Sequence, residues 1–518
     1  MSTIVETSYG KLEGVEQDGL AVFRGIPFAQ PPVGKLRYRA PQHAERWDGV
    51  RDATQFGPAC PQGPRAGAEQ PASVFGGMFA QGELDTSEDC LTLSVWTPGA
   101  DGAQRPVMVW IHGGGFRTGT GSSPMYDAVR LATRGDVVVV TINYRLAIFG
   151  FLHLASLEGA NFGILDPVAA LEWVRDEIAA FGGDPDQVTI FGESAGAKSV
   201  ETVLATPASK GLYHRAIAQS TYRAAIEPEA AALTASKVLA RLELDAGDAE
   251  TAEALRAIPG ERLLEAQQLI QEEAMAAGLT GGAASGFAPV IDGDVLPERP
   301  VDAIAGGIAR DVPLLLGTNL DESKLFGAMM PALRELDEAG LVQRLTAVIP
   351  GADRDEAVAR RAVDAYRAAR EARGEPAGPS DIWFAISTDS TFGYHSSRVA
   401  GAQSARQERT YKYLFTWQSE ALDGALGACH ALELPFVFDN WDNPLAEIAG
   451  PGAKASALAR GMQDAWLAFA KTGDPNHEGL PAWDRFDAET RGTMILGERC
   501  GMQSAPLEEK RLFWASLS

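Results

Sequence analysis

Short apolar runs alternate with longer segments of helical periodicity along the first half of the chain. Residues 107–111 and 137–144 form largely apolar runs of about strand length, as is typical of strands buried on both faces. Between residues 166 and 181, apolar residues recur every three or four positions, which predicts a helix. We expect Asp166 to cap this helix, with Pro167 at its first position. This alternation favours an α/β fold with a large, mostly parallel central sheet flanked by helices.

The rest of the chain continues this pattern without dividing into separate units. Further strands are predicted at residues 188–191, 217–219, 313–317 and 411–417. Two Ala-rich helical stretches, at approximately 226–285 and 325–400, are expected to be excursions from the sheet. Because no Ser/Gly/Pro-rich linker or internal repeat interrupts the sequence, we expect residues 1–518 to form a single domain.

Composition is ordinary for a globular protein, apart from the charge. Hydrophobic residues make up 45% and charged residues 22% of the chain, and the net charge is −24 at pH 7. Such acidity argues against nucleic acid as a partner, because phosphate binding needs clustered Lys and Arg. No apolar run approaches the roughly 18 residues of a membrane span, and the N-terminal sequence shows no secretory pattern. We therefore expect a cytoplasmic protein.

Cysteine usage gives no sign of a metal or redox centre. The four cysteines are Cys60, Cys90, Cys429 and Cys500, and their spacing matches no CxxC pattern. Cys429 precedes a candidate catalytic histidine, but we interpret it as a small buried apolar residue. We expect no metal site and no cofactor.

The segment GESAG, residues 192–196, provides a candidate nucleophile. A serine hydroxyl is a poor nucleophile at neutral pH, so it must be presented beside a base and near donors for the oxyanion. Here Ser194 follows a β-branched predicted strand and precedes a predicted helix that stops before Pro207. A strand, a sharp turn and a helix are the context in which such a serine projects above the sheet edge.

The segment HGGGF, residues 112–116, follows the predicted strand at 107–111 and provides candidate oxyanion donors. Glycines leave backbone N–H groups unobstructed, so Gly114 and Gly115 are two candidates. The amide of Ala195, directly after the nucleophile, is the third. We interpret His112 as structural because it lies inside this turn.

A histidine must accept the serine proton. The seven histidines are His43, His112, His153, His214, His395, His430 and His477. In α/β-hydrolases the acid and then the histidine follow the nucleophile along the chain, with the histidine after a late strand. His430 meets both conditions, since it follows the predicted strand at 411–417. The strand predicted at 313–317 is followed by Asp321 and Glu322, and spacing alone does not choose between these two acids.

Taken together, these segments resemble the type-B carboxylesterases, which include bacterial para-nitrobenzyl esterases, animal carboxylesterases and cholinesterases. The likeness covers nearly the whole chain. It includes FRGIPFAQPPVGKLRYRAP at 23–41, SEDCLTLSVWTP at 87–98, VWIHGGGF, VVVVTINYRLAIFGFL, GESAGA, FAPVIDG at 287–293, GTNLDES, the ACHALELPFVF segment, and WLAFAKTGDPN at 466–476. So many motifs in order are not a coincidence.

The resemblance implies roles for particular residues. In this family the acid is the glutamate of a segment like GTNxDEG, which corresponds to Glu322, and a family serine that supports the acid corresponds to Ser220. The oxyanion donors correspond to Gly114, Gly115 and Ala195. The family's disulfide-closed loop corresponds to the loop between Cys60 and Cys90, a possible disulfide. Candidate pocket residues are Phe75, Met78, Phe79 and Phe287, and because this loop has no Trp we expect no cation–π site for a quaternary ammonium there.

The sequence therefore predicts a serine carboxylesterase of bacterial character that hydrolyses uncharged carboxylic esters through an acyl-enzyme, with Ser194, His430 and Glu322 as nucleophile, base and orienting acid. The same residues serve an alternative, the hydrolysis of amides, carbamates or polyester fragments. A remote alternative is a non-catalytic adhesion or scaffold protein on this fold. The expected partner is a small-molecule ester, and the expected assembly is a monomer or homodimer.

Overall fold

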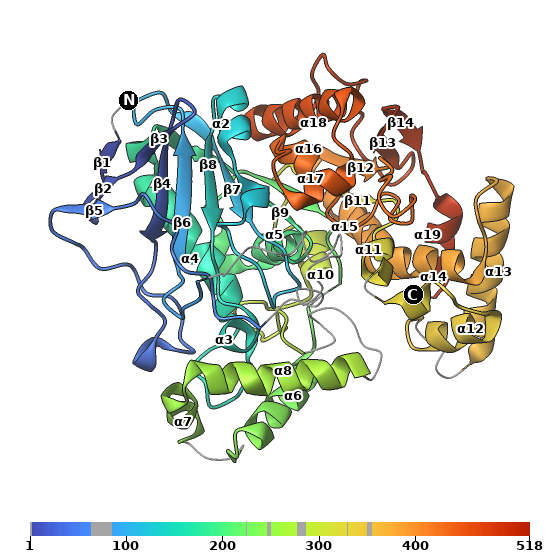
Figure 1. Cartoon of the computed structure of the whole chain (residues 1–518), viewed down its shortest axis with the longest axis horizontal. Coiled ribbons are helices and arrows are strands. Elements are labelled where there is room, and N and C mark those ends of the chain that lie inside the picture. Colours follow the sequence, from blue (N-terminus) through green and yellow to red (C-terminus); the bar gives the residue numbers. More distant parts are fainter. Residues whose placement is uncertain are drawn as a thin grey trace.

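A mixed sheet of eleven strands forms the centre of the computed structural model, which describes residues 3–63, 85–223, 225–245, 250–276, 286–328, 330–349 and 355–517 (Figure 1). In spatial order the strands are β14 (Gly501–Ser504), β13 (Gly492–Leu496), β12 (Thr410–Phe415), β11 (Leu314–Asn319), β10 (Arg215–Gln219), β9 (Gly183–Glu193), β7 (Arg105–Ile111), β8 (Val138–Ile142), β6 (Thr92–Thr97), β4 (Leu20–Pro27) and β3 (Val15–Gln17). The strands from β13 to β8 are parallel, and those at both edges are antiparallel. A second sheet joins β1 (Ile4–Glu6), β2 (Lys11–Glu13) and β5 (Val50–Asp52). The predicted α/β fold with a mostly parallel central sheet is confirmed.

Alternate residues of the central strands enter two different apolar cores. In β7, Val107, Val109 and Ile111 belong to one core, whereas Met108 and Trp110 belong to the other. Because side chains alternate across a strand, each face of the sheet is buried under its own helices. The first core receives side chains from α3 (Ala147–Phe151), α4 (Phe162–Glu177), α5 (Ala195–Ala205), α10 (Pro300–Gly306) and α15 (Tyr394–Ser404); the second receives them from α2 (Val129–Gly135), α16 (Leu434–Phe438), α17 (Pro444–Ala449) and α18 (Ala453–Thr472).

Helices occupy both stretches predicted as excursions. The first contains α6 (Pro228–Arg241), α7 (Thr251–Ala257) and α8 (Gly260–Ala276), which lie together at one end of the sheet (Figure 1). The second contains α11 (Ser323–Ala328), α12 (Glu338–Thr346), α13 (Glu356–Ala372) and α14 (Pro379–Thr388), followed by α15. Helices α12, α13 and α14 share a separate apolar cluster with the C-terminal helix α19 (Glu508–Ala515).

The strand predictions are confirmed, but the predicted start of one helix is wrong. Helix α4 begins at Phe162, after Asn161, so Asp166 does not cap it and Pro167 lies inside the helix. Asp166 instead forms a buried ion pair with Arg145, whose Nη2 lies 2.6 Å from Asp166 Oδ1. Pro167 is the sixth residue of α4, beyond the N-terminal N–H groups that have no intrahelical partner, so it removes one backbone hydrogen bond from the helix. The apolar periodicity found the helix, but a long-range ion pair explains the aspartate.

Candidate active site

Ser194 lies at the sharp turn between β9 and α5. Its backbone has φ +57° and ψ −121°, a sparsely populated conformation for a residue with a side chain. The turn is held by hydrogen bonds from the Ser194 N–H to Gln219 O at 2.9 Å and from the Lys198 N–H to Ser194 O at 2.9 Å. Gly196 lets the helix approach the sheet, because a Cβ there would lie 1.9 Å from Ile111 O. Contacts of the surrounding backbone therefore hold Ser194 in this strained conformation.

The glycine loop after β7 lies directly against this turn. A Cβ on Gly113 would be 3.2 Å from Ser194 Cβ, so the loop backbone passes beside the serine side chain. Gly114 and Gly115 have φ of +116° and +65°, and their N–H groups donate no hydrogen bond to any described residue. Ala195 is the first residue of α5, where N–H groups lack an intrahelical partner. Unpaired donors beside the serine have the chemistry of an oxyanion site.

His430 and Glu322 form a short contact below the surface. His430 Nδ1 lies 2.6 Å from Glu322 Oε2, and Glu322 has no exposed surface. The Ser220 hydroxyl donates to Glu322 Oε1 at 2.6 Å, and the Asn319 N–H donates to the same oxygen at 2.8 Å. Both carboxylate oxygens are thereby fixed, so the acid can hold the imidazole in one orientation.

Asp321, the other acid that spacing allows, faces elsewhere. Its Oδ2 accepts from the Ala428 N–H at 3.0 Å, and Oδ1 lies 2.9 Å from Lys324 Nζ. It therefore fastens the loop that carries His430 instead of contacting the ring. The structure distinguishes two adjacent acids that sequence spacing leaves equivalent.

The second ring nitrogen of His430 faces the turn that carries the serine. Its Nε2 lies 3.0 Å from Glu193 Oε1, and Glu193 directly precedes Ser194. No hydrogen bond joins the Ser194 hydroxyl to any side chain in the described part of the chain. The structure thus brings the imidazole to the residue beside the serine. A Ser–His hydrogen bond of this kind is often long or absent without substrate.

Sequence reasoning missed two further carboxylates beside His430. Glu193 was available as the second residue of GESAG, and Glu433 follows the histidine by one helical turn. Glu433 accepts from Gln219 Nε2 at 3.1 Å and from Asn319 Nδ2 at 2.7 Å. Charged residues are almost never fully buried without partners. A glutamate within an apolar segment could therefore have indicated a buried carboxylate with a functional or structural partner.

Burial and neighbouring charges shift the pKa values around this histidine. Burial raises the pKa of the Glu193 carboxyl to about 8. Burial lowers the pKa of His430, but the carboxylates of Glu193 and Glu322 outweigh it and raise that pKa to about 9. Glu193 favours the imidazolium only while it is ionised. A proton on Glu193 therefore favours the neutral imidazole that a general base requires.

Aromatic side chains form an apolar wall beside the imidazole. The rings of Phe392 and Phe326 have centroids 4.9 Å and 5.3 Å from the His430 ring. Tyr222 packs edge-on against Phe392 with centroids 5.7 Å apart. Such a wall excludes water and favours uncharged groups next to the site.

Of the remaining predicted residues, those that the structure describes lie outside this cluster. Phe287 is fully buried in the core that contains α4 and α5, while Phe75, Met78 and Phe79 fall outside the described residues. Cys60 and Cys90 are both buried free thiols in this structure. A hydrogen bond with Cys60 and burial together raise the pKa of the Cys90 thiol.

The described residues contain no group of three or more His, Cys, Asp or Glu side chains arranged to hold a metal ion. In the same part of the chain, no helix combines the length and apolar character needed to cross a membrane.

The parallel sheet with a serine at a strand–helix turn defines an α/β-hydrolase. The model of the Carboxylesterase family matches residues 1–514. The chain is 39% identical to para-nitrobenzyl esterase of Bacillus subtilis (strain 168) over 98% of this chain and 97% of that protein. It is 37% identical to phenmedipham hydrolase of Pseudarthrobacter oxydans over 96% of this chain and 95% of that protein. A carboxylesterase structure from Geobacillus stearothermophilus matches with a TM-score of 0.83 and 39% identity, covering 99% of this chain and 100% of that chain.

The chain therefore belongs to the carboxylesterase family. It is a carboxylic ester hydrolase that acts on small ester substrates.

Proposed function

We propose that this chain hydrolyses uncharged carboxylic esters with Ser194 as nucleophile, His430 as base and Glu322 as orienting acid. The amides of Gly114, Gly115 and Ala195 are the oxyanion donors, and Ser220 positions Glu322. The observation that carries the proposal is the 2.6 Å contact of His430 Nδ1 with Glu322, which leaves Nε2 facing the serine turn. The aromatic wall beside the imidazole supports an uncharged substrate.

The reaction proceeds in two steps through an acyl-enzyme. Ser194 Oγ attacks the ester carbonyl carbon while its proton passes to His430 Nε2, and the carbonyl oxygen becomes an oxyanion facing the three amides. The C–O bond to the alcohol then breaks, and the leaving oxygen takes the proton from His430. Water next attacks the acyl carbon, its proton passes to His430 and then to Ser194 Oγ, and the carboxylic acid leaves.

The test uses Ser194→Ala with Ser199→Ala as its matched control. Ser199 lies in α5, the helix that follows Ser194, and it is buried, with a hydroxyl that has no hydrogen-bond partner among the described residues. Ser194→Ala should lower kcat for a para-nitrophenyl ester by roughly 10⁴- to 10⁶-fold with folding intact, whereas Ser199→Ala should retain activity.

A fluorophosphonate probe provides a second test. It should label the unmodified chain stoichiometrically, and mass spectrometry should locate the label on Ser194. Labelling elsewhere, or full activity in Ser194→Ala, would refute the assignment.

The leaving group is a separate question for the same triad. We propose esters as the preferred class, because cleavage of an ester releases an alcohol, a better leaving group than an amine. A panel of matched ester, amide and carbamate substrates measures the preference directly. Faster turnover of the amide or carbamate would replace the ester assignment, and an absence of turnover together with failed labelling would indicate a scaffold protein.

We also propose that residues 1–518 act as one catalytic domain, as a monomer or homodimer, in a bacterial cytoplasm. Ser194, Glu322 and His430 all come from one chain, so no second subunit is needed to complete the site. Free thiols at Cys60 and Cys90 are typical of a reducing compartment. Light scattering would measure the assembly, and fractionation of the producing cells would test the compartment.

A further inference from the structure

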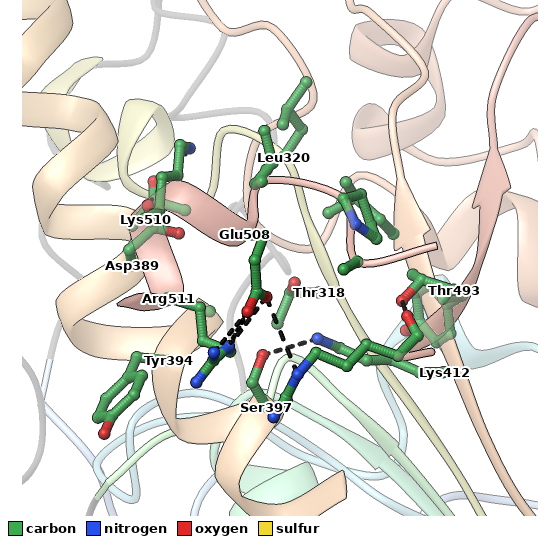
Figure 2. Close-up of a pocket in the computed structure, with 18 of the residues that line it drawn as sticks. Thr318, Leu320, Asp389, Tyr394, Ser397, Lys412, Thr493, Glu508, Lys510 and Arg511 are labelled. Atoms are coloured by element: carbon green, nitrogen blue, oxygen red, sulfur yellow. Dashed lines mark hydrogen bonds and ion pairs between the residues drawn. The ribbon is translucent and has the colours of Figure 1, made fainter. Parts of the chain in front are cut away.

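A cationic cavity lies behind the loop that carries Glu322, away from the serine turn. It has a volume of about 60 Å³ and is lined by the ends of β11 and α14, the starts of α15 and α19, and residues of β12 and β13. A water needs roughly 10–15 Å³ of such volume, so the cavity has room for roughly four to six waters or one compact oxyanion. Figure 2 shows side chains from these elements pointing into a common space.

The basic side chains that line this cavity outnumber its acids. The cations are Lys412, Arg491, Lys510 and Arg511, and the two carboxylates are Asp389 and Glu508. Such an excess of positive charge is unusual in a chain whose net charge is −24.

Two of the four cations already have close ionic partners. Arg511 Nε lies 2.9 Å from Glu508 Oε2, and Lys510 Nζ lies 3.3 Å from Asp389 Oδ2 (Figure 2). Asp389 also accepts from the Tyr366 hydroxyl at 2.8 Å. The acids of the cavity are therefore used by these two cations.

The other two cations lack a close carboxylate. Lys412 Nζ donates to the Ser397 hydroxyl at 2.7 Å, and no described carboxylate forms an ion pair with it. Arg491 Nε lies 3.9 Å from Glu508, which Arg511 holds more closely. Burial, with Arg491 acting in the same direction, lowers the pKa of Lys412 to about 8. The partners of the Lys412 ammonium are thus one hydroxyl and, at 5.9 Å, the face of the Phe486 ring, and neither carries the negative charge that an added anion would supply.

We propose that this cavity is a binding site for a small oxyanion, a phosphate or a short carboxylate, held by Lys412 and Arg491. Hydroxyls of Thr318 and Ser397 line the same space and would supply neutral donors to further oxygens, whereas the Thr493 hydroxyl already donates to Arg491 O at 3.0 Å. A guanidinium and an ammonium that line one small cavity suit an anion with several oxygens. The cavity is too small for a nucleotide.

The cavity shares its wall with residues that hold the catalytic acid. Asn319 lines the cavity, and its N–H donates to Glu322 Oε1 at 2.8 Å. Thr388 also lines it, and its hydroxyl accepts from the Ser323 N–H at 3.1 Å. An anion bound here would stabilise the two segments that support Glu322 without touching the substrate.

The test measures binding of sodium phosphate and, separately, sodium acetate by calorimetry at pH 7, with ionic strength held constant by NaCl. The unmodified protein should show a saturable signal for at least one of these two anions, and a Tm that rises with its concentration. Lys412→Gln should weaken that binding by at least about tenfold. Lys11→Gln makes the same charge change on the small sheet, far from the cavity (Figure 1), and should leave binding unchanged.

Each outcome decides the proposal. Saturable phosphate binding identifies a phosphate site, and saturable acetate binding without phosphate binding identifies a carboxylate site. If Lys412→Gln does not fold, Arg491→Gln, whose side chain is 22% exposed, replaces it with the same expected loss. No saturable binding of either anion, or equal binding by the cavity variant and Lys11→Gln, would overturn the proposal. Ser194→Ala protein should bind the anion normally, so failure of the proposed catalytic mechanism would leave this test intact.

Discussion

At the scale of single residues, the site is distinguished by its buried carboxylates. Glu193, Glu322 and Glu433 lie near one imidazole, that of His430, and all three are buried. Glu322 contacts Nδ1, whereas Glu193 lies at Nε2, the nitrogen that must accept the serine proton in the proposed reaction. The charge on Glu193 should therefore control how readily His430 acts as a base.

We predict that Glu193→Gln moves the acid limb of the kcat/KM profile to lower pH. The ionised Glu193 carboxylate is one of the charges that raise the pKa of His430 to about 9, so removing it lowers that pKa. Catalysis needs the neutral imidazole, and the activity should therefore persist to a pH lower by roughly one unit. The measurement is kcat/KM for a neutral para-nitrophenyl ester between pH 5 and 10.

Glu229→Gln, an exposed change on α6, is the control for this profile and should leave the limb in place. A limb that stays where it was in Glu193→Gln, or moves to higher pH, would show that Glu193 does not act on the imidazole. A lower activity at every pH with the same limb would indicate a steric role instead.

At the scale of elements, the close approach of α5 to β7 determines the position of Ser194, which directly precedes α5. A Cβ on Gly196 would lie 1.9 Å from Ile111 O, a backbone atom that cannot rotate away. We predict that Gly196→Ala pushes the start of α5 off the sheet and costs about 1–3 kcal/mol of unfolding free energy. Because Ser194 and Ala195 move with the helix, kcat/KM should fall by roughly 100-fold. Urea denaturation and ester kinetics measure the two effects.

Gly401→Ala in α15 is the matched control. A Cβ there would meet no atom within 4 Å, so alanine should raise the free energy of unfolding by about 0.5–1 kcal/mol with unchanged kinetics. A Gly196→Ala protein as stable and active as this control would show that the contact of α5 with β7 does not set the serine position.

Local signals accounted for most elements but not for long-range partners. Apolar runs predicted β7 and β8, because a strand buried on both faces needs no knowledge of its neighbours. The start of α4 was missed because Asp166 looks like a cap in sequence, whereas its partner Arg145 lies 21 positions away. Sequence spacing could not distinguish Asp321 from Glu322 for the same reason. The answer depends on which of the two carboxylates the fold brings to His430. Family resemblance supplied that choice.

At the scale of the whole molecule, charge is distributed unevenly. The chain carries a net charge of −24, yet the cavity behind the acid loop has more cations than carboxylates. The overall negative potential acts over a Debye length of about 30 Å at 0.01 M ionic strength and about 8 Å at 0.15 M. An approaching anionic substrate therefore meets a repulsion that salt can remove, whereas the desolvation cost at the aromatic wall does not depend on salt.

We predict that this repulsion appears as a salt dependence specific to charged esters. The comparison pairs para-nitrophenyl butyrate with mono-para-nitrophenyl succinate, an ester of similar length that carries a free carboxylate. Between 0.01 M and 0.15 M NaCl, kcat/KM for the succinate ester should rise several-fold, because screening removes long-range repulsion during encounter. The butyrate ester should change by less than about twofold. If both esters respond alike, the net charge does not influence substrate approach, and the preference for uncharged esters must arise entirely from desolvation beside Phe326 and Phe392.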